Sequence, residues 1–275
     1  IFTKKESTYI FVIMAKETGI QLYNKVLGVA LQVPGVKVNR EAFLRNTFSD
    51  FCTPEQLDLI VKDNPRAHLE IELLDQVAKN VISRARKEVT SISALSGIPG
   101  NPFAAAGLAV ADMGQYMGFC MNVSQKLAYV YGFPDMLKDG ELSDNSKNIL
   151  TALIGVMFGV QQSVKVINYI SKALAVQVAK RLPTIAFGHA AWYVFIKQIA
   201  KWIGIRMSKQ LFAKTVSKII PFVGAGISGG ITYATFGPAA NKLAQQLRFN
   251  SKFFKDVEHT ATTVVEDAEY QEMDK

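Results

Sequence analysis

Residues 145–255 contain no Asp or Glu, although they carry 15 Lys and Arg. The flanking regions differ, because residues 1–144 have a net charge of −1 and residues 256–275 a net charge of −6. Whatever elements residues 145–255 form can therefore present only apolar, neutral polar or cationic surface. Such a surface suits an anionic bilayer, because Lys and Arg lay their alkyl stems on apolar groups while their charges reach the headgroups. Membrane contact is the leading expectation.

The chain is long and apolar enough to bury a large core in one or two domains, with 275 residues of which 49% are hydrophobic. Its two cysteines, Cys52 and Cys120, lack CxxC spacing and neighbouring histidines, so neither a disulfide scaffold nor a zinc site is predicted. A reducing cytoplasm fits this cysteine usage. No secretory signal is visible, and MAKETGIQLY from Met14 resembles a natural start. Residues 1–14 are therefore predicted to be a non-native or disordered leader.

Helix signals dominate the first part of the chain, and strand signals are nearly absent throughout. Apolar residues recur at helical spacing, and the predicted helices are 15–33, 40–48, 54–63 and 65–95. Asn39 is the expected N-cap of the second helix, and Thr53 with Gln56 forms the capping box of the third. Asn64 and Pro65 are expected to open the long fourth helix. Residues 15–95 are predicted to form a polar helical subdomain.

The composition changes at Ser96, where the turn motif SGIPGNP begins. The helices predicted beyond it are 101–131, 144–182, 184–205, 208–219 and 221–247. An interruption of the second near Gly155 and Gly159 stays open. Residues 96–249 are predicted to be a glycine-rich, basic, apolar helical region, followed by an acidic tail over 250–275. The predicted fold is all-α: a multi-helix bundle with a glycine-rich apolar C-terminal helical region.

Two uncharged windows, 89–111 and 219–241, are each 23 residues long and could in length span a bilayer. Both are interrupted by Pro and Gly, so packing in a helical core is expected, and insertion of 219–241 into lipid stays open. GxxxG spacing occurs at Gly114/Gly118, Gly155/Gly159 and Gly226/Gly230. This spacing lets helix backbones approach each other. Internal packing is the main expectation, with contact in an oligomer or a membrane as the alternative.

Two blocks of the sequence resemble the hallmark blocks of the EcsC family of bacterial proteins, with a resemblance that covers residues 69–249. They are ALSGIPGNPFAAAGLAVADMGQYMGFCMNVSQKLAYVYGFPD and IIPFVGAGISGGITYATFGPAANKLAQQLRF. The matching positions are Gly97, Pro99, Gly100, Asp112, Tyr131, Gly132, Pro221, Gly224, Gly226, Phe236 and Ala240. The resemblance implies an α-helical bacterial protein, in a family with one member encoded beside an ABC transporter and no established enzymatic activity. Gly230 joins these candidates from the small face of the last helix.

Other motifs are rejected on their context. Gly224, Gly226 and Gly229 spell GxGxxG, but a dinucleotide site needs a preceding strand and an acidic residue about 20 positions on. The three histidines are scattered, and no GxSxG nucleophile motif occurs. We therefore predict no metal, no cofactor and no catalytic residue.

Asp112 is the only carboxylate between Glu88 and Asp135. A buried unpaired carboxylate is costly and would protonate instead. A salt bridge to a cation of residues 145–255 is therefore the main expectation. Exposure to solvent and a catalytic or proton-handling role stay open, the last of which would make the protein a hydrolase with a site near Asp112.

A basic face extends over the helices of residues 165–218 and includes Lys165 and Lys172. Its lipid-binding candidates are Lys197, Lys201, Trp202, Arg206, Lys209, Lys214 and Lys218. Tryptophan and tyrosine suit a membrane interface, whereas no nucleic-acid-binding module is present and no nucleic acid is expected. A solvated face and an acidic partner protein stay open, and so does shielding by the acidic tail from Asp256 onward.

The sequence thus predicts a non-catalytic, membrane-associated accessory protein of the EcsC type. We expect it in the cytoplasm, peripheral to the inner face of the cell membrane, with its basic helices on anionic lipid or on an integral membrane protein. The alternatives are the hydrolase and a soluble helical scaffold, and homo-oligomerisation stays open.

Overall fold

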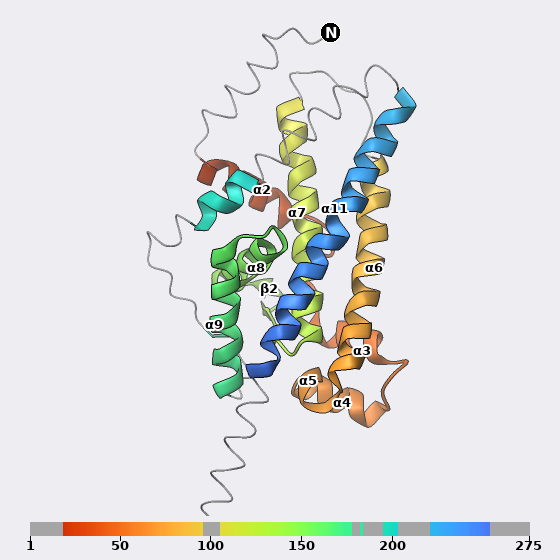
Figure 1. The fold of residues 1–275 in the computed structure, drawn as a ribbon, viewed down its shortest axis with the longest axis vertical. Helices are drawn as coiled ribbons and strands as arrows, with labels where there is room; N and C mark the ends of the chain where they lie inside the picture. Colours follow the sequence, from red (N-terminus) through yellow and green to blue (C-terminus); the bar gives the residue numbers. More distant parts are fainter. Residues whose placement is uncertain (1–18, 96–104, 178–181, 184–194, 203–220, 254–275) are drawn as a thin grey trace, which may run out of the picture.

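The computed structural model describes residues 19–95, 105–177, 182–183, 195–202 and 221–253. Helices make up nearly all of the regular structure in these ranges, which confirms the predicted all-α bundle (Figure 1). The helices are α2 (Gly19–Ala30), α3 (Arg40–Phe48), α4 (Pro54–Lys62), α5 (Pro65–His68), α6 (Ile71–Leu95), α7 (Ala105–Val130), α8 (Asp144–Met157), α9 (Gln161–Gln177) and α11 (Pro221–Asn250). Residues 195–202 are helical as well.

Helix α7 lies at the centre of the bundle. Most of its side chains from Met113 to Val130 are buried, on every side of the helix. A helix that is apolar all round has to be covered all round, and α2, α3, α6, α8 and α11 all contact α7 (Figure 1). Helix α6 also packs along α11. One hydrophobic cluster therefore joins residues from both the polar and the basic parts of the sequence.

The small residues of α7 bring α2 close to its backbone. A Cβ atom added at Gly118 would lie 2.6 Å from Cγ2 of Val33 and 3.0 Å from the carbonyl oxygen of Ala30. One turn earlier, a Cβ at Gly114 would collide with the side chain of Val29. The close approach predicted for this GxxxG pair is present, and it is made within the chain.

The predicted helix ends are confirmed where they depend on local caps. The side chain of Asn39 accepts a hydrogen bond from the backbone N–H of Ala42 at 2.8 Å, and both bonds of the Thr53–Gln56 capping box are formed. Gly132 has φ of +93° just after α7, and Gly159 has φ of +79° between α8 and α9. Glycine adopts this left-handed conformation without steric cost, which ends a helix.

The prediction of one continuous helix from Pro65 to about Leu95 is wrong. It is divided into α5 and α6, with Leu69 in an extended conformation between them. The N–H of Leu69 bonds to the carbonyl of Pro65 and closes the short helix. Arg66 donates from Nη2 to the carbonyl oxygen of Ser251 at 2.7 Å, which attaches α5 to the end of α11. This tertiary bond fixes α5 separately from α6.

The segment after α7, between the predicted helices 101–131 and 144–182, contains a small hairpin that the sequence analysis did not predict. Strands β1 (Leu137–Lys138) and β2 (Glu141–Leu142) pair antiparallel, Leu137 opposite Leu142. Asp139 and Gly140 join them with φ of 54° and 78°. An Asp-Gly pair with two positive φ angles is the favoured two-residue hairpin turn.

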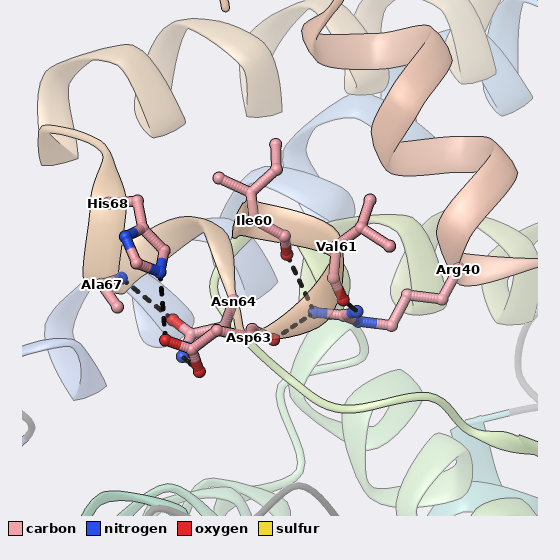
Figure 2. Close-up of polar contacts among 7 residues, drawn as sticks. All are labelled: Arg40, Ile60, Val61, Asp63, Asn64, Ala67 and His68. Atoms are coloured by element: carbon pink, nitrogen blue, oxygen red, sulfur yellow. Dashed lines mark hydrogen bonds and ion pairs between the residues drawn. The ribbon is translucent and has the colours of Figure 1, made fainter. Parts of the chain in front are cut away.

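A buried arginine joins three parts of the bundle, and Figure 2 shows its bonds to the end of α4. Arg40, at the start of α3, donates to the backbone oxygens of Val61 at 2.7 Å, Asp63 at 2.9 Å and Phe133 at 3.1 Å. Burial lowers the pKa of Arg40, and nearby Asp135 and Asp63 partly offset this. The carbonyls at the end of α4 have no partner within their helix. Arg40 supplies that partner and ties α3 and α4 to the segment that follows α7.

Gly118→Ala tests the contact between α2 and α7. The added methyl overpacks against Val33, so we expect the free energy of unfolding to fall by about 1–3 kcal/mol. Gly28→Ala is the matched control, because a Cβ there meets nothing within 4 Å; helix propensity should stabilise it by about 0.5–1 kcal/mol. Urea unfolding of the three proteins measures both changes, and a neutral or stabilising Gly118→Ala would contradict the contact.

Arg40→Met tests the buried arginine. The variant has an apolar side chain and leaves four backbone carbonyls without the Arg40 donor, at a cost of about 1–3 kcal/mol for each acceptor that becomes buried and unsatisfied. We expect a large fall in the thermal unfolding midpoint. Arg45→Met on the same helix removes exposed ion pairs and should change the midpoint little. Equal midpoints for the two variants would refute the joining role of Arg40.

Candidate functional site

The structure accounts for part of the candidate residues. Those outside the described residues are Gly97, Pro99, Gly100, Arg206, Lys209, Lys214 and Lys218. The candidates in the first part of α11 are Pro221, Gly224, Gly226 and Gly230. Packing at Gly226 and Gly230 stays a prediction. Asp112 lies half-buried on α7, and its salt bridge to a C-terminal cation stays a prediction as well.

Tyr131 takes part in a tie between three helices. Its hydroxyl donates to Oδ1 of Asp75 on α6 at 2.8 Å, and Arg248 on α11 donates from Nε to Oδ2 of the same carboxylate. Burial, followed by the neighbouring Asp75, raises the pKa of Tyr131. The next residue, Gly132, passes close to Asn64, since a Cβ there would lie 3.1 Å from Oδ1. Both family-block residues therefore have structural roles.

Tyr23 and Tyr129 are two further buried tyrosines with raised pKa values. The Tyr23 hydroxyl lies 2.7 Å from Oγ1 of Thr151, and burial raises the pKa of Tyr23 to about 12. The Tyr129 oxygen accepts the backbone N–H of Met136 at 3.1 Å. Burial is also the main cause of the raised pKa of Tyr129. Each phenol is thus held in its neutral form inside the bundle.

Residues 195–202 form an amphipathic helical segment. Phe195 and Ile199 are buried, whereas Lys197 and Lys201 are exposed. The Trp202 ring stacks on Phe158, with centroids 3.4 Å apart and planes within 5°. Trp202 is half-buried and packs against the bundle. Of the three lipid-binding candidates described here, only the two lysines face solvent.

A second set of side chains faces solvent where α9 lies beside the end of α11 (Figure 1). Tyr169 is 58% exposed and Phe249 is 52% exposed, the two largest exposures among the large hydrophobic side chains of the described residues. The ammonium of Lys252 lies 5.1 Å from the centroid of the Phe249 ring, and that of Lys172 lies 5.0 Å from the Phe253 ring. We call Tyr169, Lys172, Phe249, Lys252 and Phe253 the aromatic–lysine surface.

Side-chain amide hydrogen bonds, one of them buried, link the two helices that carry this surface. Gln246 of α11 donates from Nε2 to Oδ1 of Asn168 on α9 at 2.9 Å. Asn250 donates from Nδ2 to Oγ of Ser171 at 3.0 Å, and both of these residues are fully buried. Satisfied buried polar networks specify one packing arrangement, because any shift leaves polar groups unpaired. Asn168 directly precedes Tyr169, and Ser171 directly precedes Lys172. The network therefore fixes the positions of Tyr169 and Lys172 relative to α11.

The electrostatics of this surface follow from the acid-free sequence. Neither α9 nor α11 contains an Asp or Glu, and Lys165 adds a further exposed cation one turn before Tyr169. The nearest described carboxylate partner of α11, Asp75, is engaged with Arg248 and Tyr131. The surface therefore combines exposed aromatic rings with positive charge, a chemistry that fits an anionic and partly apolar partner.

Lys172 belonged to the predicted basic face, but the sequence analysis missed the aromatic members and Lys252. A signal was present in the spacing, since Phe249 and Phe253 lie one helical turn apart and their rings meet edge to face at 6.5 Å. Only the packing of α9 on α11 brings Lys172 beside Phe253.

Comparisons with models of known protein families, with curated proteins and with solved structures find no match to this chain. The resemblance to the EcsC family therefore rests on the two sequence blocks. In the described ranges no three His, Cys, Asp or Glu side chains gather as metal ligands. Within the same ranges, no helix combines the length and the hydropathy that crossing a bilayer requires.

The buried tyrosines predict an alkaline loss of stability. A phenol whose pKa is raised by folding binds its proton more tightly in the folded state, so its stabilisation is complete below about pH 10 and is lost as the pH rises through the folded pKa. The free energy of unfolding should fall above about pH 10, and Tyr23→Phe should reduce this fall. Urea unfolding across this range measures it, with the exposed Tyr169→Phe as control. A Tyr23→Phe curve parallel to that of the unaltered protein would contradict it.

Proposed function

We propose that this protein is a non-catalytic peripheral membrane protein that binds anionic lipid headgroups through the aromatic–lysine surface. The observation that carries the proposal is the alternation of exposed rings and lysines on two helices that contain no acid. Lys197 and Lys201 add two exposed cations on the amphipathic segment of residues 195–202. The proposed location is the cytoplasmic face of the cell membrane.

The chemistry of a bilayer interface matches each component of the surface. Tyrosine favours the headgroup level, where its ring is half in an apolar environment, and phenylalanine adds apolar area that can enter the bilayer. Each Lys near an anionic leaflet contributes about 1 kcal/mol of attraction. Tyr169 and Phe249 supply the rings, and Lys165, Lys172 and Lys252 supply the charges. Because the hydrogen bonds of Gln246 and Asn250 fix α9 on α11, the surface is formed before binding and little ordering entropy is lost.

The EcsC resemblance favours an accessory role near an integral membrane protein, in keeping with a family that has a member encoded beside an ABC transporter. In this proposal the lipid surface is the primary contact, and a membrane protein partner would be met at the same bilayer. The small-residue face at Gly114 and Gly118 is occupied by α2, so it does not serve that partner.

Vesicle co-sedimentation tests the proposal. We expect the protein to bind vesicles rich in phosphatidylserine and to release them as salt rises, because the screening length shortens from about 30 Å at 0.01 M to about 8 Å at 0.15 M. Lys172→Gln with Lys252→Gln should weaken binding by about 30-fold, the equivalent of about 1 kcal/mol per lysine.

The matched control is Lys62→Gln with Lys79→Gln, which removes two exposed lysines from α4 and α6 and leaves the aromatic–lysine surface unchanged. It should keep most of the affinity. Equal binding of the unaltered protein to neutral vesicles at high salt would refute the proposal. An equal loss in both double variants would refute this surface as the contact.

A further inference from the structure

The aromatic–lysine surface is left open by the described parts of the chain. More than half of each of the Tyr169 and Phe249 side chains is exposed, beside two lysines. Clustered apolar groups exposed in this way mark a contact surface. Away from a membrane, an occupant that brings both carboxylates and apolar side chains would bury the rings and pair the lysines.

The sequence contains one segment of that chemistry. Residues 264–274 read VVEDAEYQEMD, with five carboxylates and no Lys or Arg, and with valine, tyrosine and methionine between the acids. Residues 256–275 together have a net charge of −6, against the acid-free α9 and α11. Acids elsewhere in the bundle are engaged at a distance from this surface, as Glu41 and Asp58 are with Arg45.

The covalent connection keeps this segment within reach of the surface. Phe253 is both a member of the aromatic–lysine surface and the residue that directly precedes residues 254–275. Twelve residues separate Phe253 from Glu266, and a chain of that length reaches at most about 40 Å. A short tether gives an effective local concentration on the order of 1 mM, so even a contact with a dissociation constant of about 0.1 mM would be closed about ten times in eleven.

We infer that residues 256–275 cover the aromatic–lysine surface of their own chain, with carboxylates of 266–274 on Lys172 and Lys252, and that anionic headgroups compete for the same lysines. The proposed contact within the chain depends only on the charge complementarity and on the short connection from Phe253, and not on the proposed function. The competition rests on the proposed function. The protein would then bind only membranes that contain enough anionic lipid to displace the acidic segment from the surface.

Zero-length carboxyl-to-amine cross-linking of the full chain, followed by peptide mass spectrometry, tests the contact without lipid. We expect links from Lys172 or Lys252 to carboxylates of 266–274 in the monomer, fading as salt rises because the attraction is screened. Lys62 and Lys79, exposed on α4 and α6, are the internal controls. Links that favour the controls, or that form only between two copies, would overturn the inference.

Vesicle binding tests the competition. Neutralising the five carboxylates of 266–274 as Asn or Gln should tighten binding to phosphatidylserine vesicles about tenfold, because a surface open about one time in eleven has its apparent affinity lowered by that fraction. A control variant of equal net charge neutralises five exposed acids elsewhere, namely Asp50, Glu55, Glu70, Asp139 and Glu141. It should show a much smaller gain.

The two proposals fail in different ways. If no variant binds vesicles while the cross-links to Lys172 or Lys252 persist, the proposed function is refuted and the contact within the chain stands. If the unaltered protein and the variant of 266–274 bind anionic vesicles equally, the competition is refuted and lipid binding stands. An equal gain in the control variant would attribute the effect to net charge and overturn the competition.

Discussion

The burial of α7 is the constraint on which the arrangement of the other helices depends. From Met113 onward this helix is apolar around most of its circumference, and water must be excluded from all of it. The helices that cover α7 come from both ends of the sequence. Helix α2 lies against Gly114 and Gly118, and α6 and α11 both pack against α7 (Figure 1). The cationic helices are thereby held on a scaffold whose N-terminal part has charges of both signs.

Polar contacts at the helix ends fix the relative positions of helices that apolar packing holds together. Arg40 joins the end of α4 to the segment after α7 through backbone carbonyls, and Asp75 joins Tyr131 to Arg248. Apolar contacts alone are non-directional and tolerate sliding, whereas a buried donor is satisfied in few positions. These ties therefore fix how the helices meet at the end of the bundle where the aromatic–lysine surface also lies, since Arg66 of α5 bonds the carbonyl of Ser251 there.

The division of charge along the sequence becomes a division of surface in the fold. Several acids of residues 1–144 pair with that part's own cations, as Glu41 and Asp58 do with Arg45. Others pair with cations of the acid-free stretch, Asp144 with Lys147 and Asp75 with Arg248. Helix α9 and the end of α11 keep exposed lysines and contain no acidic residue. Because residues 145–255 contain no acid, the packing of α9 on α11 produces a cationic face. The proposed lipid contact and the proposed cover by residues 256–275 both follow from this one asymmetry.

The sequence by itself determined the features that depend on neighbours a few positions apart. The caps at Asn39 and Thr53 and the helix ends at Gly132 and Gly159 were predictable, because each is a hydrogen bond or a backbone angle set within about one turn. The Asp139–Gly140 hairpin turn was predictable on the same grounds and was missed.

Only the tertiary structure decided the break between α5 and α6, the partners of Arg40 and the aromatic–lysine surface. Each joins residues that are distant along the chain, as Lys172 and Phe253 are, or Arg66 and Ser251. Which of several compatible apolar faces meet is determined by the packing of the whole core around α7, since hydrophobic burial has no direction of its own. A periodic pattern marks the face of a helix that is buried, and the neighbour that covers it is chosen by the fold.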